Sequence, residues 1–171
     1  MRWLWLSAVV VALDQLPKWL ASTLLIFHEP LPVVPFLNLT LTHNTGAAFS
    51  FLSQAGGWQR WFFAAVAVGV SIALVLWMRR VPRGEWWVSA GLALVLGGAV
   101  GNLVDRLALG YVVDFVDLYY GAWHWPAFNL ADSAITVGVA VLLIDALRGE
   151  GHERQSSRQE PQRRRGAEGD R

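Results

Sequence analysis

The stretch FNLADSAITVGVAVLLIDAL, residues 128–147, is long and apolar enough to cross a membrane, yet it has an aspartate near its start. About 20 predominantly apolar residues span the hydrocarbon core of a bilayer as a helix. An ionisable side chain such as Asp132 costs about 2.5–3.5 kcal/mol at the centre of such a helix on insertion scales, so it marks a functional site by default. The stretch therefore predicts a transmembrane helix with a candidate site at one end.

Three more segments have the same apolar character, at about residues 3–27, 61–78 and 86–104. Of the 171 residues 54% are hydrophobic and ten are Trp, and the mean hydropathy is +0.37. Aromatic residues lie at many edges of the segments, as in the interfacial belts of membrane proteins. The first segment contains Asp14 and Lys18 and no small-residue cleavage site follows it, so we interpret it as a retained span. We expect a mainly α-helical membrane protein with four transmembrane helices.

Basic residues indicate the orientation of these helices. Arg2 precedes the first span, Arg79, Arg80 and Arg83 lie between the second and third, and an Arg-rich tail follows the fourth. The connections 28–57 and 105–127 contain a single basic residue between them, Arg106. The positive-inside rule therefore predicts cytoplasmic termini and two long loops outside.

The sequences of the two outer loops predict a small β-sheet and a short helix or lid. Residues 37–42 alternate apolar and polar side chains, which indicates a strand, and residues 48–52 are a candidate second strand. The aromatic segment 118–126 is expected to form a short interfacial helix or lid, and Asp117 beside it a solvated loop charge. We expect one four-span domain over residues 1–148 and a disordered cytoplasmic tail over 149–171, because the tail has almost nothing to bury.

Polar residues converge on the outer ends of the spans. Asp114, in YVVDF (residues 111–115), lies between the third and fourth spans, close to Asp132 in this topology. Two carboxylates that meet in an apolar setting share a proton and can activate water. The other candidate residues at this depth are Asp14, Lys18, Asn44, Asn102, Asp105, Arg106 and Asn129.

Each of these residues also has a structural interpretation, which the sequence leaves open. Asp14 and Lys18 form an i,i+4 pair of the orientation that stabilises a helix, and Asp105 could be an interfacial charge. Asn129 could cap the fourth span, as asparagine commonly does. Asp132 could be stabilised by the helix dipole without any chemistry.

Other chemistries find little support. The chain has no cysteine, which excludes disulfides and thiolate catalysis, and its four histidines show no metal-ligand spacing. A small proton-coupled transporter or channel subunit is the alternative function. It would need polar residues through the full membrane depth, whereas the inner halves of the spans are apolar except for Asp145. We expect no metal, no cofactor and no nucleic-acid partner.

Five sequence blocks occur in a fixed order: DQLPK (14–18), NTGAAF (44–49), GGAVGNLVDR (97–106), GYVVDF (110–115) and FNLADS (128–133). Together they resemble the motifs of the bacterial lipoprotein signal peptidases (signal peptidase II), and the resemblance covers about residues 9–146. Pro17 and Ser50 depart from the usual family pattern, and neither belongs to the aspartate pair.

The resemblance implies an intramembrane aspartyl endopeptidase that cleaves diacylglyceryl-modified prolipoproteins just before the lipidated cysteine. It implies a protein of the bacterial inner membrane, with its active site near the outer leaflet among membrane lipids, and sensitivity to globomycin-type inhibitors. Four spans could form a complete site, so we expect a monomer. By motif position the catalytic pair would be Asp114 and Asp132. The residues implied to line or support the site are Asn44, Asn102, Arg106 and Asn129, with Asp14 and Lys18.

Overall fold

The computed structural model describes residues 2–46 and 56–167, with side chains described up to residue 148. Four of its helices have the length and hydropathy to cross a membrane, as the sequence predicts. They are α1 (Leu4–Leu24), α2 (Gln59–Arg80), α3 (Trp86–Ala108) and the part of α4 (Leu130–Ala167) that ends at Arg148. The predicted strand at 48–52 lies outside the described residues.

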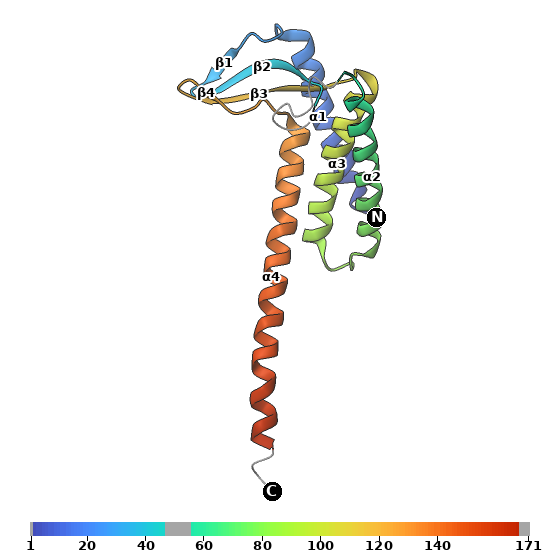
Figure 1. The fold of residues 1–171 in the computed structure, drawn as a ribbon, viewed down its shortest axis with the longest axis vertical. Helices are drawn as coiled ribbons and strands as arrows, with labels where there is room; N and C mark the ends of the chain where they lie inside the picture. The colour runs from blue at the N-terminus through green and yellow to red at the C-terminus, as the bar shows by residue number, and fades with distance from the viewer. Residues whose placement is uncertain (1, 47–55, 168–171) are drawn as a thin grey trace.

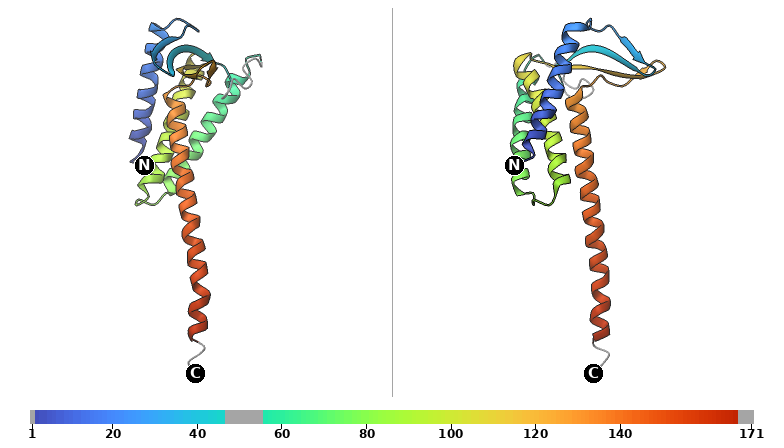
Figure 2. Two further views of the ribbon diagram at one scale, coloured as in Figure 1. Left: turned by 90° about the vertical axis from the view of Figure 1, so that its left-hand side faces the viewer. Right: turned by 180° about the vertical axis from the view of Figure 1, so that it is seen from behind.

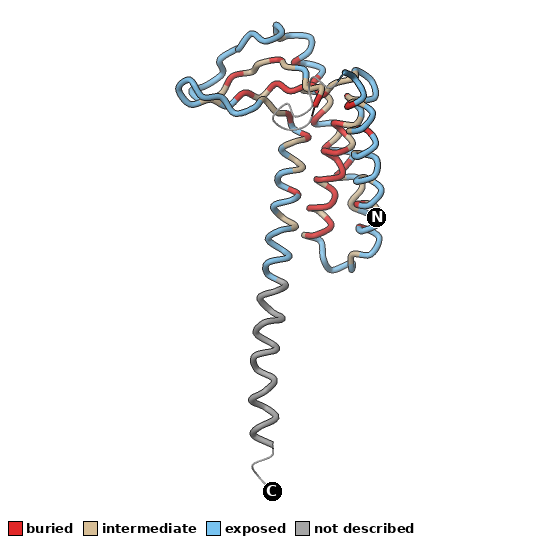
Figure 3. The backbone as a smooth tube through the Cα atoms, in the orientation of Figure 1, coloured by how far each residue is buried: buried red, intermediate tan, exposed pale blue. Residues whose placement is uncertain are grey.

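Helix α3 is the centre of the bundle, and α1, α2 and α4 all pack against it. Most residues of α3 are buried, whereas the neighbouring helices are largely exposed (Figure 3). Glycines allow the close approach that membrane helices use in place of a hydrophobic driving force. A Cβ on Gly98 would collide with the backbone oxygen of Ala131, and one on Gly101 would lie 2.6 Å from Oδ2 of Asp14.

A four-stranded antiparallel sheet lies across one end of the helices (Figure 1). Its strands, in spatial order, are β1 (Leu31–Val34), β2 (Leu37–Asn44), β3 (Val112–Tyr120) and β4 (Trp123–His124). Strand β2 confirms the strand predicted from the alternation at 37–42. It pairs with β3 so that Thr42 lies opposite Asp114.

The aromatic segment 118–126 forms a β-hairpin, so the expectation of a short helix there was wrong, and a lid role stays a prediction. Tyr119 pairs with His124 and Tyr120 with Trp123, which joins β3 to β4. Gly121 in the turn has φ +61°. Glycine adopts this conformation without steric cost, so the turn can be tight and the segment extends the sheet.

Helix α4 projects far beyond the other helices (Figures 1 and 2). Its membrane-spanning part ends at Arg148, and the helix continues to Ala167. The disordered cytoplasmic tail expected over residues 149–171 stays a prediction.

Candidate active site

Asp114 enters the site from β3, one of the two central strands of the sheet, and its side chain is almost completely buried. One carboxylate oxygen accepts a hydrogen bond from Nδ2 of Asn129 at 2.7 Å, and the other accepts one from Nδ2 of Asn44 at 3.1 Å. The Thr42 hydroxyl donates to its backbone carbonyl at 3.3 Å. Among the described residues, no Lys, Arg or His nitrogen lies within 4.0 Å of this carboxylate, so neutral amides alone hold it.

Asp132 lies in the first turn of α4 and is half-buried. Its Oδ1 accepts a hydrogen bond from Nδ2 of Asn102 at 2.8 Å. Its backbone N–H donates to Oδ1 of Asn129 at 2.9 Å, and the backbone N–H of Asn129 donates to Oδ2 of Asp132 at 3.3 Å. This reciprocal pattern is a capping box at the start of α4. Asn129 therefore caps the helix and at the same time links the two aspartates.

The pKa of Asp114 is raised from its ordinary value of 3.8 to about 7. Burial is the main cause, because it disfavours the charged form, and repulsion from the Asp132 carboxylate adds to it. The hydrogen bonds from Asn44 and Asn129 favour the charged form and act in the opposite direction. A proton can therefore reside on Asp114 near neutral pH.

Lys18 is the buried cation of the site, and each proton of its ammonium group has an acceptor. Its Nζ lies 2.7 Å from Oδ2 of Asp14 and 2.9 Å from Oδ2 of Asp105, and it donates to Oδ1 of Asn102 at 2.9 Å. The i,i+4 pair predicted within α1 is thus confirmed, and it extends to α3. A lysine ammonium has three donors, so Lys18 is fully satisfied.

The two carboxylates beside Lys18 also bind the backbone of other elements. Oδ1 of Asp14 accepts the N–H of Ala131 in α4 at 2.9 Å, and Oδ2 of Asp105 accepts the N–H of Val113 in β3 at 3.1 Å. Gln15 donates to Oδ1 of Asp105 at 2.8 Å. These contacts tie α1 and α3 to the two elements that carry the aspartate pair. Gln15 stands in the first motif but was not among the predicted site residues.

Arg106 lies beside the aspartate pair at the end of α3. Its guanidinium donates to the backbone carbonyls of Gly46 at 3.0 Å and Asn102 at 3.3 Å, and lies 5.4 Å from the centre of the Phe63 ring. Its charge interacts with the carboxylates of Asp132 and Asp114. All nine predicted site residues therefore gather at the sheet end of the bundle.

Asp117 corrects a further expectation, because it is buried and not a solvated loop charge. Its carboxylate accepts hydrogen bonds from Asn38 and Thr40, each at 3.1 Å, and lies 2.8 Å from Nδ1 of His124. Although burial opposes ionisation, these hydrogen bonds, led by that of His124, hold the pKa of Asp117 below its usual value. Asp117 thus connects β2, β3 and β4.

The chemical capacity of the site follows from the two carboxylates that Asn129 links. Two acidic groups in unequal environments can divide the roles of proton acceptor and proton donor. No group of three His, Asp or Glu side chains that could hold a metal ion occurs in the part of the chain that the structure describes. The arrangement is suited to activating a water molecule and protonating a carbonyl oxygen.

Comparison with known sequences identifies related proteins over almost the whole membrane domain. The family model described as "Signal peptidase (SPase) II" matches residues 6–148. A lipoprotein signal peptidase of Acinetobacter baumannii is 59% identical over 143 residues, covering 84% of this chain and 81% of the relative. One from Teredinibacter turnerae is 52% identical over 149 residues, covering 87% of this chain and 89% of the relative.

Solved structures agree with the fold. A structure described as a bacterial membrane enzyme matches with a TM-score of 0.80 and 32% identity, covering 88% of this chain and 90% of the other. A second one matches with a TM-score of 0.75 and 33% identity, covering 85% and 92%. The four helices and the sheet therefore have a counterpart in solved membrane enzymes.

Proposed function

This chain belongs to the signal peptidase II family, and from that premise we propose that Asp114 and Asp132 are the catalytic pair of its aspartic peptidase activity. The reaction is removal of the signal peptide from a prolipoprotein whose cysteine carries diacylglycerol, with cleavage just before that cysteine. The observation that supports this most is the setting of Asp114. It is buried, held by amides alone, and has a pKa raised to about 7 by burial and by the adjacent Asp132.

The proposed mechanism uses one shared proton. The ionised member of the pair removes a proton from water, which attacks the scissile carbonyl carbon. The protonated member donates to the carbonyl oxygen and stabilises the tetrahedral intermediate. The raised pKa of Asp114 favours Asp114 as the donor and the half-exposed Asp132 as the base. The observed titration belongs to the pair as a whole.

The surrounding residues position the substrate and the pair. Arg106 has donors left beyond its two carbonyl contacts, so it can hold a peptide carbonyl or a lipid ester oxygen. Asn44 and Asn129 fix the orientation of the Asp114 carboxylate. A globomycin-type cyclic peptide would compete for these same groups.

The sheet end of the molecule, which contains the aspartate pair, faces the outer leaflet of the bacterial inner membrane in this proposal. Arg2, Arg79, Arg80 and Arg83 lie at the other end, which is the cytoplasmic one by the positive-inside rule. The aspartate pair, its amides and Lys18 all belong to one chain, which supports a monomeric enzyme surrounded by membrane lipids.

A proton-coupled transporter is less consistent with the distribution of charge. It needs ionisable groups through the membrane. Among the described residues, the buried charged side chains are Asp14, Lys18, Asp105, Asp114 and Asp117, all at the sheet end. Within the described residues, the opposite half of the bundle has no buried charged side chain that could relay protons.

Cleavage of a diacylglyceryl-modified prolipoprotein by the purified enzyme tests the proposal. We expect Asp114→Asn and Asp132→Asn each to lower kcat by about 10²–10⁴-fold, because each removes a proton-transfer group. Asp117→Asn is the matched control, since it changes another buried aspartate of β3 and should retain activity. Globomycin should inhibit the wild type.

Thermal unfolding of each variant in detergent separates lost chemistry from lost structure. A folded Asp114→Asn or Asp132→Asn protein that cleaves at nearly the wild-type rate would show that the pair is wrongly assigned. Cleavage that depends on added zinc and is abolished by a chelator would also contradict the mechanism.

A further inference from the structure

A groove opens on the flank of the bundle between α1 and α2, on the side that a membrane would cover. Both helices pack against α3 more than against each other, so α3 forms the floor. The groove has a volume of about 540 Å³. Its apolar lining residues include Ala8, Val11, Ile72, Val75, Leu76 and Leu96.

The groove offers little to a polar ligand. Its two hydroxyl groups are already engaged, because Ser7 donates to the carbonyl of Ala93 at 2.9 Å and Ser71 donates to that of Ala67 at 2.7 Å. The remaining polar group is Arg79, which lies at the end of the groove away from the sheet. The shape and chemistry suit a hydrocarbon chain with a negative group at that end.

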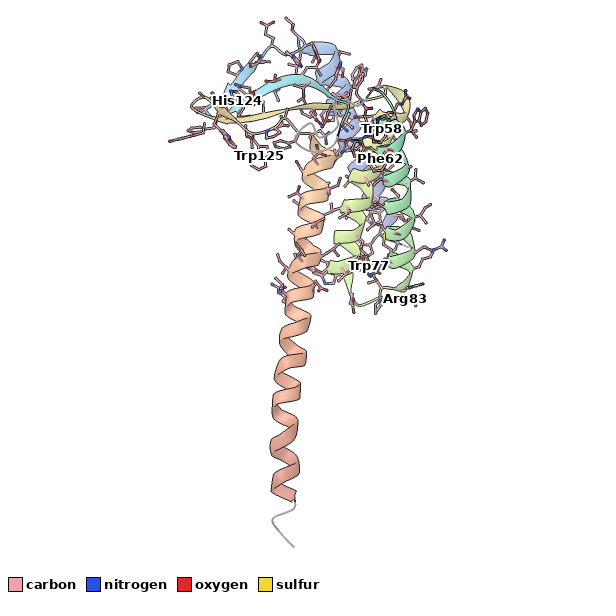
Figure 4. The ribbon with its side chains drawn as sticks, viewed as in Figure 1. Trp58, Phe62, Trp77, Arg83, His124 and Trp125 are labelled. Atoms are coloured by element: carbon pink, nitrogen blue, oxygen red, sulfur yellow. The ribbon has the colours of Figure 1, made fainter. Side chains whose placement is uncertain are left out.

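A second cavity lies at the same end of the bundle as Arg79. It has a volume of about 310 Å³ and is lined in part by Arg2, Trp3 and Arg83. Figure 4 shows Arg83 at the turn after α2, just beyond Trp77. Among the described residues, Arg79 at the apolar groove and Arg2 and Arg83 at the second cavity thus have no carboxylate within 4.0 Å.

We propose that this groove binds a phospholipid with an anionic headgroup, with one acyl chain between α1 and α2 and the phosphate at Arg79, Arg83 and Arg2. Guanidinium groups match phosphate oxygens in geometry and charge, and basic pockets between transmembrane helices bind lipid headgroups. A peptide helix has a diameter of about 10–12 Å with its side chains, so a single alkyl chain fits a shallow groove better. The lipid would fill the space between α1 and α2.

Native mass spectrometry of the full chain tests the proposal without relying on peptidase activity. The protein is released from detergent after equilibration with phosphatidylglycerol or phosphatidylcholine. We expect the wild type to retain phosphatidylglycerol preferentially, and Arg79→Gln or Arg83→Gln to weaken this retention by about fivefold, as expected for one basic residue near a lipid phosphate. Arg80→Gln is the matched control, since Arg80 neighbours Arg79 but lines neither cavity.

A second variant tests the groove itself. Ala8→Phe fills it without changing a charge, and it should reduce retention of phosphatidylglycerol as much as Arg79→Gln does. Equal losses in Arg80→Gln and Arg79→Gln would show diffuse charge attraction and overturn the site. Full retention by Ala8→Phe, or displacement of the lipid by a signal-helix peptide, would likewise exclude an acyl-chain site.

Discussion

Two groups of carboxylates lie side by side at the sheet end of this molecule, and their partners differ. Asp14 and Asp105 share the ammonium group of Lys18, whereas Asp114 and Asp132 accept hydrogen bonds from neutral amides. A cation at 2.7–2.9 Å stabilises the charged form of a carboxylate. The other pair has only neutral amides as partners, and burial together with repulsion from Asp132 raises the pKa of Asp114 to about 7. The partner, cation or amide, thus separates the two carboxylates that tie the helices together from the two that we propose to be catalytic.

Removal of Lys18 would break the structural group and should have the largest effect on stability. Lys18→Met leaves Asp14 and Asp105 buried without their cation, and breaking a buried ion pair costs about 3–5 kcal/mol. We expect a large loss of thermal stability in detergent, followed by loss of activity. Asp114→Asn should lose activity while keeping the wild-type melting temperature, since it leaves no charge unpaired.

If Lys18→Met and Asp114→Asn behave alike, the distinction between structural and catalytic carboxylates is wrong. A Lys18→Met protein with wild-type melting temperature and reduced cleavage would assign Lys18 to the chemistry. An Asp114→Asn protein that unfolds as readily as Lys18→Met would assign Asp114 to the structural group.

A smaller loss of thermal stability is expected when the close approach of α1 and α3 is disturbed. A Cβ at Gly101 would lie 2.6 Å from Oδ2 of Asp14, the same oxygen that binds Lys18. Overpacking of this kind costs about 1–3 kcal/mol, so Gly101→Ala should lower the melting temperature. Gly69→Ala is the matched control, because a Cβ there meets nothing within 4 Å. Equal melting temperatures of the two variants would contradict the packing argument.

The local signals of the sequence were enough to predict the spans, the strand at 37–42 and the convergence of the polar residues. Hydrophobic runs and period-two alternation are local, and the order of spans fixes which ends share a membrane surface. In each case a short segment contains the whole signal.

The missed features depend on distant partners. The burial of Asp117 requires Asn38, which lies 79 residues earlier in the chain, and β4 exists because Tyr120 pairs with Trp123. An aromatic segment alone is compatible with an interfacial helix or a strand. Gln15 was overlooked because a neutral side chain beside Asp14 gives no signal until Asp105 of α3 is positioned against it.

The raised pKa of Asp114 predicts a pH limit on activity. Its neutral form donates the proton in the proposed mechanism, and the folded pKa is raised from 3.8 to about 7. Raising the pH through 7 removes that proton, so kcat/KM should fall about tenfold for each pH unit above it, or about 1.4 kcal/mol. The same raised pKa means that its contribution to stability is full below pH 3.8 and is lost as the pH rises through 7.

Cleavage rates measured between pH 5 and pH 9 test this expected fall of kcat/KM above pH 7. Asp117→Asn is the control here as well. The pKa of Asp117 is lowered, so its carboxyl group should not titrate in this range. A rate that stays constant from pH 7 to pH 9 would mean that the pair does not lose its proton there.

The smallest expected effect concerns the hairpin at the far end of the sheet. Trp123 is exposed on β4, next to the His124 that binds Asp117, and its ring packs edge-on against that of Trp125 (Figure 4 labels His124 and Trp125). If this aromatic surface holds the lipidated peptide, Trp123→Ala should raise KM about two- to fivefold, with kcat and melting temperature unchanged, as loss of one aromatic contact implies. Trp77→Ala removes another exposed tryptophan, from the opposite end of the bundle, and should leave KM unchanged. A KM that is the same in both variants would separate the hairpin from substrate binding and confine recognition to the residues around Asp114 and Asp132.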